Sequence, residues 1–301
     1  MFVRLTMLTP IRLLTATTLG CALASLVAAG CGRAARAEEA YAAVLSSHAS
    51  TLQHPEAATP SQIMLAVEAL TAIPPLAPGS QLAAQAIEQI GLMHLARRDT
   101  AGARRAFNEV FWSYFPHRGT ALMALVYIGR SHELDGNWIE ATKAYRRITD
   151  YHAWHPIWLD GPLYIADMHL RRKDLPAARE AYQDAVGLLR RRLHNAPGPV
   201  QRLQVRTRLL IAYRALGDVA QAHVLHEELL AEGRDAQDPD TLLEFARTCR
   251  DSLDEPALTR RTYERLLNQF PQHALAAVAR HELQQLPPPL GAPPEESIYL
   301  Q

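Results

Sequence analysis

A small residue followed four positions later by a ring-bearing residue recurs along this chain at nearly even spacing. The pairs are Ala103 with Phe107, Ala141 with Tyr145, Ala178 with Tyr182, Ala222 with His226, and Thr259 with Tyr263. Their first members lie 38, 37, 44 and 37 residues apart. Residues four apart share one face of a helix, where the small side chain lets a second helix approach and the ring fills space beside it. The spacing therefore predicts a series of repeated helical units.

Each unit contains two helices. Twelve residues before the small residue stands another small or apolar residue, namely Gly91, Gly129, Ala166 or Leu210, inside an apolar run of helical period. In the stretch DGNWIEATKAY, Gly136 lies where the first helix must end and the second must begin. The pattern thus predicts antiparallel helix pairs.

The positions of these residues resemble the tetratricopeptide repeat (TPR). The matching residues are Ile90, Gly91, Ala103, Phe107 and Pro116; then Ile128, Gly129, Gly136, Ala141 and Tyr145; and, more weakly, Gly217 with Ala222 and Tyr263 with Pro271. The resemblance covers roughly Gln81 to Leu286, although a TPR repeats at about 34 residues and these units are longer. It implies an all-α, TPR-like solenoid of five to six helix-turn-helix units with a C-terminal capping helix.

The first thirty residues differ from the repeats. Arg4 and Arg12 precede nineteen residues without a charge, which is typical of an export signal. An uncleaved membrane anchor is the alternative, because about 20 apolar residues span a bilayer. We therefore divide the chain into an export signal at 1–30, a linker at 31–37, a repeat domain at 38–286 and a Pro-rich disordered tail at 287–301.

Two modes of cleavage remain open. The stretch LVAAGCG resembles the lipobox of bacterial lipoproteins, which implies lipidation at Cys31, although Ala28 stands where that family prefers Leu. Ordinary cleavage after Ala37 fits the small-x-small rule. If Cys31 is lipidated and Cys21 is removed, Cys249 is left as a single thiol and no intramolecular disulfide can form.

The TPR resemblance implies a binding groove lined by the first helix of each pair. Its positions here are Gln85, Glu88, Arg130, Glu133, Asp160, Asp167, Gln204 and Arg214. These side chains are mixed in charge, which suits an extended peptide. A second candidate surface is an aromatic edge formed by Trp112, Tyr114, Trp154 and Trp158, because large aromatics gathered at the ends of successive units often anchor an interface.

Catalytic and metal-binding patterns are weak. His152 and His155 beside Asp150 come nearest to a zinc site, and the sequence has no HExxH or CxxC pattern. His94, His132 and His169 occupy the position where the TPR pattern has Tyr, which indicates space filling between helices more than pH sensing. The basic neighbours of Cys249 could lower its pKa, although a buried structural thiol is the simpler interpretation. We expect no metal, cofactor or enzymatic activity.

The charge balance further limits the function. The chain has 31 basic and 31 acidic residues, which argues against a nucleic-acid binder. We therefore expect a non-catalytic scaffold of the bacterial envelope, an outer-membrane lipoprotein facing the periplasm, whose partners are other envelope proteins or extended peptides. Its layout resembles TPR lipoproteins of outer-membrane protein assembly, cell-wall hydrolase adaptors and pilus pilotins. The alternatives are a soluble periplasmic binding module and a hydrolase that uses His152, His155 or Cys249.

Overall fold

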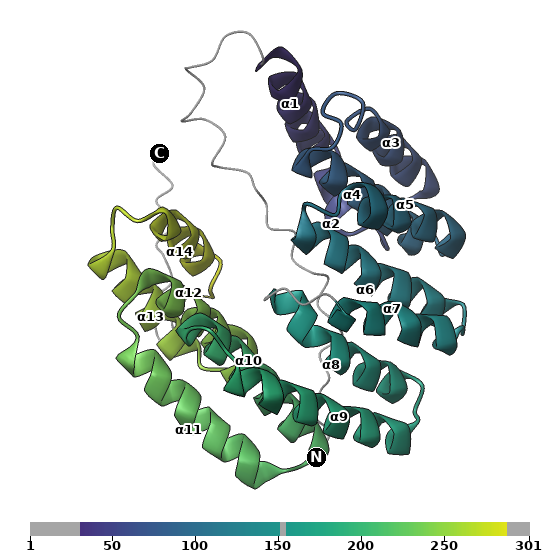
Figure 1. The fold of residues 1–301 in the computed structure, drawn as a ribbon. Helices are drawn as coiled ribbons and strands as arrows, with labels where there is room; N and C mark the ends of the chain where they lie inside the picture. The colour runs from purple at the N-terminus through teal and green to yellow at the C-terminus, as the bar shows by residue number, and fades with distance from the viewer. Residues whose placement is uncertain (1–30, 151–154, 288–301) are drawn as a thin grey trace, which may run out of the picture. The chain divides into compact units, whose positions relative to one another are not determined.

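The computed structural model describes residues 31–150 and 155–287, and within these ranges all regular secondary structure is helical (Figure 1). The chain divides into two compact units, one ending at Tyr151 and the other beginning at His152. The expected export signal, Trp154, His152 and nearly all of the expected tail lie outside the described residues.

Unit 1 contains the first seven helices. They are α1 (Cys31–Ser47), α2 (Ala49–Gln53), α3 (Pro60–Thr71), α4 (Gln81–Ala96), α5 (Thr100–Ser113), α6 (Arg118–Leu134) and α7 (Trp138–Asp150). Helices α4 with α5 and α6 with α7 form the two regular pairs, and α1 to α3 pack before them. Helix α1 begins at Cys31, so the expected linker at 31–37 continues directly into the helix that follows it. The Ala-rich sequence of this segment favours the helix.

Unit 2 contains three further pairs and a closing helix. They are α8 (Pro156–Arg171) with α9 (Leu175–His194), α10 (Pro199–Leu216) with α11 (Val219–Asp235), and α12 (Pro239–Thr248) with α13 (Pro256–Gln269), followed by α14 (Ala274–Gln284). A π-helical turn, Cys249–Leu253, ends α12. The five pairs and the closing helix confirm the expected TPR-like, all-α architecture.

The turn inside each pair has a repeated backbone conformation. One residue has a positive φ in every turn, namely Arg98, Gly136, Lys173, Gly217 or Asp254. These residues are spaced 38, 37, 44 and 37 apart, which confirms the repeat period expected from the sequence. In the first four turns the next residue donates its N–H to the carbonyl five positions earlier, as from Asp99 to His94, and so closes the helix end.

In the first two regular pairs, an aromatic ring of the second helix packs directly against a glycine of the first helix. A Cβ added to Gly91 would lie 2.5 Å from the ring of Phe107, and one added to Gly129 would lie 2.4 Å from the ring of Tyr145. Both rings are at most 1% exposed. In the third pair the residues at the same positions, Ala166 and Tyr182, are both buried in one apolar core. The spacing of small and aromatic residues in the sequence therefore indicates a direct contact between the two helices of one unit.

Successive pairs meet mainly where the second helix of one pair packs on the first helix of the next, as α5 does on α6 and α9 on α10, and their first helices also touch one another. Helix α4 contacts α6 in unit 1, while α8 contacts α10, α10 contacts α12 and α12 contacts α14 in unit 2. In each unit the first helices therefore form one layer, which carries the side chains that the sequence assigns to a groove. Among the helices of the described residues, none has the length and apolar character needed to cross a membrane.

The ring contact gives a stability prediction with an internal control. We expect Gly129→Ala to destabilise the chain by about 1–3 kcal/mol, because the added methyl group overlaps the Tyr145 ring. At Gly187 of α9 a Cβ would meet only the end of the flexible Arg191, at 3.7 Å. Gly187→Ala should therefore stabilise its helix by about 0.5–1 kcal/mol. Urea unfolding measures both changes, and shifts in the same direction would contradict the contact.

Candidate binding face on the first helices

All eight groove residues expected from the sequence lie on first helices. Gln85 and Glu88 are on α4, Arg130 and Glu133 on α6, Asp160 and Asp167 on α8, and Gln204 and Arg214 on α10. The two units thus carry four of them each. Their surroundings differ sharply, and this decides which of them can meet a partner.

Glu133 is part of the interior of unit 1. Its side chain is 4% exposed, accepts a hydrogen bond of 2.5 Å from the hydroxyl of Tyr145 and forms an ion pair of 2.8 Å with Arg130. Truncating such a carboxylate would leave buried donors without a partner. Glu133 therefore joins α6 to α7 through Tyr145, while Arg130 pairs with Glu133 within α6, so these two expected groove residues are engaged with each other.

The groove residues of unit 2 are also engaged within the unit. Asp160 accepts two hydrogen bonds from Arg208, of 2.8 and 3.3 Å, and Asp167 accepts one from the hydroxyl of Tyr182. Gln204 is 8% exposed. Arg214 is exposed, and its guanidinium donates to the carbonyl of Ser252 at 2.5 Å. The first-helix layer of unit 2 is therefore largely self-paired.

A buried charge cluster near the end of unit 2 was not expected from the sequence. Glu282 of α14 accepts hydrogen bonds from Arg247 at 2.5 Å, from Arg250 at 2.9 Å and from the Tyr263 hydroxyl at 2.7 Å. Burial alone would raise the pKa of Glu282, but the hydrogen bonds from Arg247 and Tyr263 outweigh it and lower that pKa. The cluster joins α12, α13 and α14, and its members lie too far apart in sequence for spacing to reveal them.

Glu88 differs from the other acidic groove residues, because no described residue forms a hydrogen bond or ion pair with its partly buried carboxyl group. Burial raises its pKa to about 7. The carboxyl is close enough to Tyr41 of α1 and Tyr127 of α6 to act on both phenols electrostatically. Burial, and after it Glu88, raises the pKa of Tyr41 to about 12 and also raises that of Tyr127.

The groups around Glu88 are held in place by packing. The ring of Tyr127 stacks on Phe107 with 4.9 Å between ring centroids and 27° between planes. Tyr41 is 9% exposed and belongs to the apolar core of α1, α3 and α4. The neighbouring Gln89 is 6% exposed, and its side-chain oxygen is buried without a hydrogen-bond partner. This part of unit 1 therefore contains hydrogen-bond acceptors that lack donors among the described residues.

The residues of the expected aromatic edge do not share one environment. Trp112 is 69% exposed, whereas Tyr114 and Trp158 are 7% and 2% exposed, and Trp154 lies outside the described residues. Buried rings cannot form an exposed patch, so Tyr114 and Trp158 act in packing. Around Trp112, the guanidinium of Arg147 lies 4.6 Å from the ring centroid of Phe111 and 5.3 Å from that of Trp112.

The histidines expected at the Tyr position lie at the ends of first helices. His94 contacts the carboxylate of Asp99 at 2.8 Å, and burial lowers the pKa of His132. His169 keeps a buried ring nitrogen without a hydrogen-bond partner among the described residues. The backbone carbonyl of each histidine accepts the N–H that closes its turn, so the three residues have a structural role.

Candidate catalytic residues are not assembled in the described parts of the chain. Cys249 is buried, and this burial raises its thiol pKa to about 12, the reverse of the lowering that basic neighbours suggested. A thiol with so high a pKa is a poor nucleophile. His155 caps α8 by accepting from the N–H of Ile157 at 3.3 Å. Within residues 31–150 and 155–287, no group of three or more His, Cys, Asp or Glu side chains could hold a metal ion.

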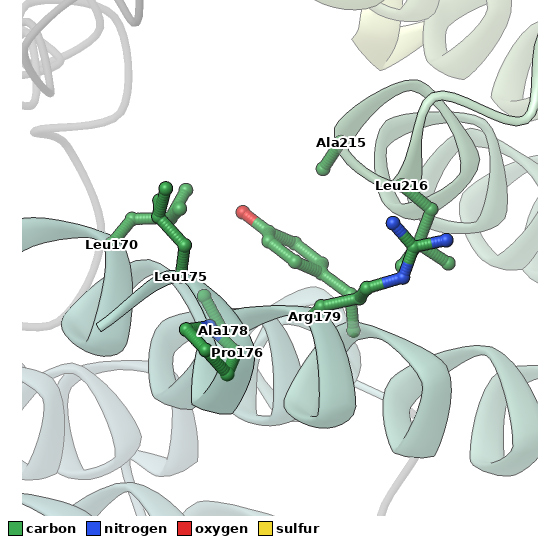
Figure 2. Close-up of a pocket in the computed structure, with 8 residues that line it drawn as sticks. Leu170, Leu175, Pro176, Ala178, Arg179, Ala215 and Leu216 are labelled. Carbon is green, nitrogen blue, oxygen red and sulfur yellow. The ribbon is translucent and has the colours of Figure 1, made fainter. Parts of the chain in front are cut away.

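An open apolar hollow of about 470 Å³ lies in unit 2 at the turn between α8 and α9. Figure 2 shows Leu170 and Leu175 facing Arg179 and Leu216 across it. Leu175 is 65% exposed. Sequence spacing gives no sign of this hollow, because its residues come from three helices.

Comparison with known proteins finds other helical-repeat structures. The sequence matches no protein-family profile and no curated protein. Similar solved structures include PilF of Pseudomonas aeruginosa, with 14% identity and a TM-score of 0.38 over 83% of this chain and 98% of that chain. A tetratricopeptide repeat protein from Parabacteroides merdae has 12% identity and a TM-score of 0.28, covering 82% and 98%.

A third similar structure is the TPR2AB domain of yeast Sti1 in a complex with pHSP90. It has 12% identity and a TM-score of 0.32, covering 84% of this chain and 97% of that chain. These similarities concern the helical-repeat fold alone.

The raised pKa of Glu88 predicts a pH dependence of stability. Between its ordinary value of 4.5 and about 7, the folded state holds a proton that the unfolded state releases. The free energy of unfolding should therefore fall as pH rises through this window, by about 3 kcal/mol in total. Glu88→Gln should be more stable than wild type at pH 8 and nearly equal to it at pH 4. Urea unfolding at both pH values measures this.

The exposed Glu68 of α3 provides the control for this measurement. Glu68→Gln removes the same charge from the same unit without relieving burial, so it should show no such difference between pH 4 and pH 8. An equal effect of Glu88→Gln at both pH values would show that the carboxyl group is not destabilised by burial.

Proposed function

We propose that this protein is a non-catalytic scaffold of the bacterial cell envelope, anchored to a membrane through lipid at Cys31, which binds extended segments of partner proteins on the first helices of unit 1. The observation that carries the binding proposal is the partly buried carboxyl group of Glu88 on that face, which is unpaired among the described residues. The other acidic groove residues, Glu133, Asp160 and Asp167, are hydrogen-bonded within the protein, so Glu88 is the one that a partner could satisfy.

The position of Glu88 supports a binding surface more than a structural role. Buried charges in folded proteins are normally paired or hydrogen-bonded. Glu133, Asp160, Asp167 and Glu282 follow this rule. A group that departs from it and raises the free energy of the unbound fold is typical of a functional position.

The location in the envelope rests on the sequence. A basic segment followed by nineteen uncharged residues and the LVAAGCG stretch favours export and lipidation. Partners in outer-membrane protein assembly or in recruitment of cell-wall enzymes suit an outer-membrane scaffold facing the periplasm. The alternative is a soluble periplasmic module released by cleavage after Ala37. A hydrolase based on Cys249 has less support, because that thiol is buried and its pKa is raised.

A crosslinking pull-down from solubilised membranes tests the binding face. We expect wild type to recover specific envelope proteins and Gln85→Arg to lose most of them, because Gln85 lies one turn from Glu88 on α4 and the added cation would fill the site. Glu68→Arg places an arginine on α3 with a larger change of charge than Gln85→Arg, and it should still retain the partners. Equal recovery by both variants would place the binding surface elsewhere.

The N-terminal mass of the mature protein tests the anchor. Lipidation predicts an N-terminal peptide beginning at Cys31 with the added mass of acyl chains, and Cys31→Ala should move the protein out of the membrane fraction. A mature chain that begins at Glu38 would support the soluble alternative. That result would leave the binding proposal intact.

A further inference from the structure

We infer that the partly buried carboxyl group of Glu88, on α4 of unit 1, binds the cationic side chain of a lysine or arginine in a partner's extended segment. This inference rests on the proposed function, in which the first helices of unit 1 form the binding surface, and it names the chemistry that they recognise. Helix α4 contacts both α1, which carries Tyr41, and α6, which carries Tyr127.

The charge of the surroundings points to a cation. Helices α1, α3, α5 and α6 pack against α4. Among the basic residues of these helices with described side chains, Arg36 and Arg105 are exposed and none pairs with Glu88. Arg104 is bound to Asp135 at 2.6 Å and Arg130 to Glu133 at 2.8 Å. The carboxylate therefore lacks a counter-charge within the described protein.

The aromatic groups favour a cation over a neutral donor. Ammonium and guanidinium groups are attracted to the faces and hydroxyls of tyrosines as well as to carboxylates. Tyr127 is fixed by its stack on Phe107 and Tyr41 by the apolar core, so little side-chain entropy is lost when a ligand orders them. An acidic side chain at this point would add repulsion to an already destabilised carboxylate.

A metal ion fits the site poorly. Calcium takes six to eight oxygen ligands and magnesium demands an octahedral set. Glu88 supplies a single carboxylate, and the described residues contain no group of three potential ligands. A flexible side chain that carries one positive charge and several N–H donors matches one carboxylate and two phenols better.

Selection of peptides tests the inference and does not require the partner to be identified first. A displayed library of random twelve-residue peptides is panned at pH 7.5 against the immobilised full chain in mild detergent, as wild type, Glu88→Gln and Glu68→Gln. We expect lysine or arginine to be enriched at one position by wild type and by Glu68→Gln, and this enrichment to disappear with Glu88→Gln.

A double-mutant cycle then assigns the contact. The best selected peptide is synthesised with lysine or with the uncharged norleucine at the enriched position, and its dissociation constant is measured by fluorescence anisotropy. Loss of the charge should weaken binding to wild type about tenfold, as for a charge-assisted hydrogen bond at a partly exposed site. The same exchange should change binding to Glu88→Gln less than about threefold, because the coupling is gone.

The outcomes separate the two proposals. Peptides that bind without a preferred cation, or whose preference survives Glu88→Gln, would overturn the cation site and leave the scaffold proposal standing. Recovery of no specific peptide would overturn both. Thermal melts of the three proteins establish that each is folded, and Glu88→Gln should be at least as stable as wild type because it removes a buried charge.

Discussion

The structure depends on the close approach of an aromatic ring to a helix backbone that has no side chain at the point of contact. Phe107 on Gly91 and Tyr145 on Gly129 bring the second helix of a pair against the first at a distance that any Cβ would prevent. This contact sets the spacing within a unit, and the first helix packs in addition on the second helix of the preceding pair. The layer of first helices follows from it.

The aromatic residue of the second helix also supplies a hydrogen-bond donor to acidic side chains. Tyr145, Tyr182 and Tyr263 use their hydroxyl groups to bind the carboxylates of Glu133, Asp167 and Glu282. The first regular pair carries Phe107 instead, which has no hydroxyl group to donate, and the acidic residue of its first helix, Glu88, has no donor from the described residues. The three tyrosines thus combine packing with a hydrogen bond to a carboxylate, and Glu88 has no such donor among the described residues.

The repeated architecture could be predicted from the sequence, because the contact that defines each unit joins residues that are close together in the chain. Gly91, Ala103 and Phe107 lie within one helix pair, so their spacing carries the geometry, and the turn residues follow the same period. Charge pairing was not predictable in this way. Asp160 meets Arg208 across 48 residues and Arg247 meets Glu282 across 35 residues, so a list of groove positions could not separate free side chains from paired ones. Burial of Tyr114 and Trp158 was likewise decided by neighbouring helices.

Titration of Glu88 itself tests most directly whether it is an unsatisfied carboxylate on an otherwise neutralised face. The chain is labelled with ¹³C at glutamate side-chain carboxyl carbons, and the Glu88 signal is assigned by its loss in Glu88→Gln. We predict a midpoint near pH 7 in the free protein. A midpoint near the ordinary glutamate value of 4.5 would mean that the carboxyl group is solvated or paired, and would contradict the proposed role of Glu88.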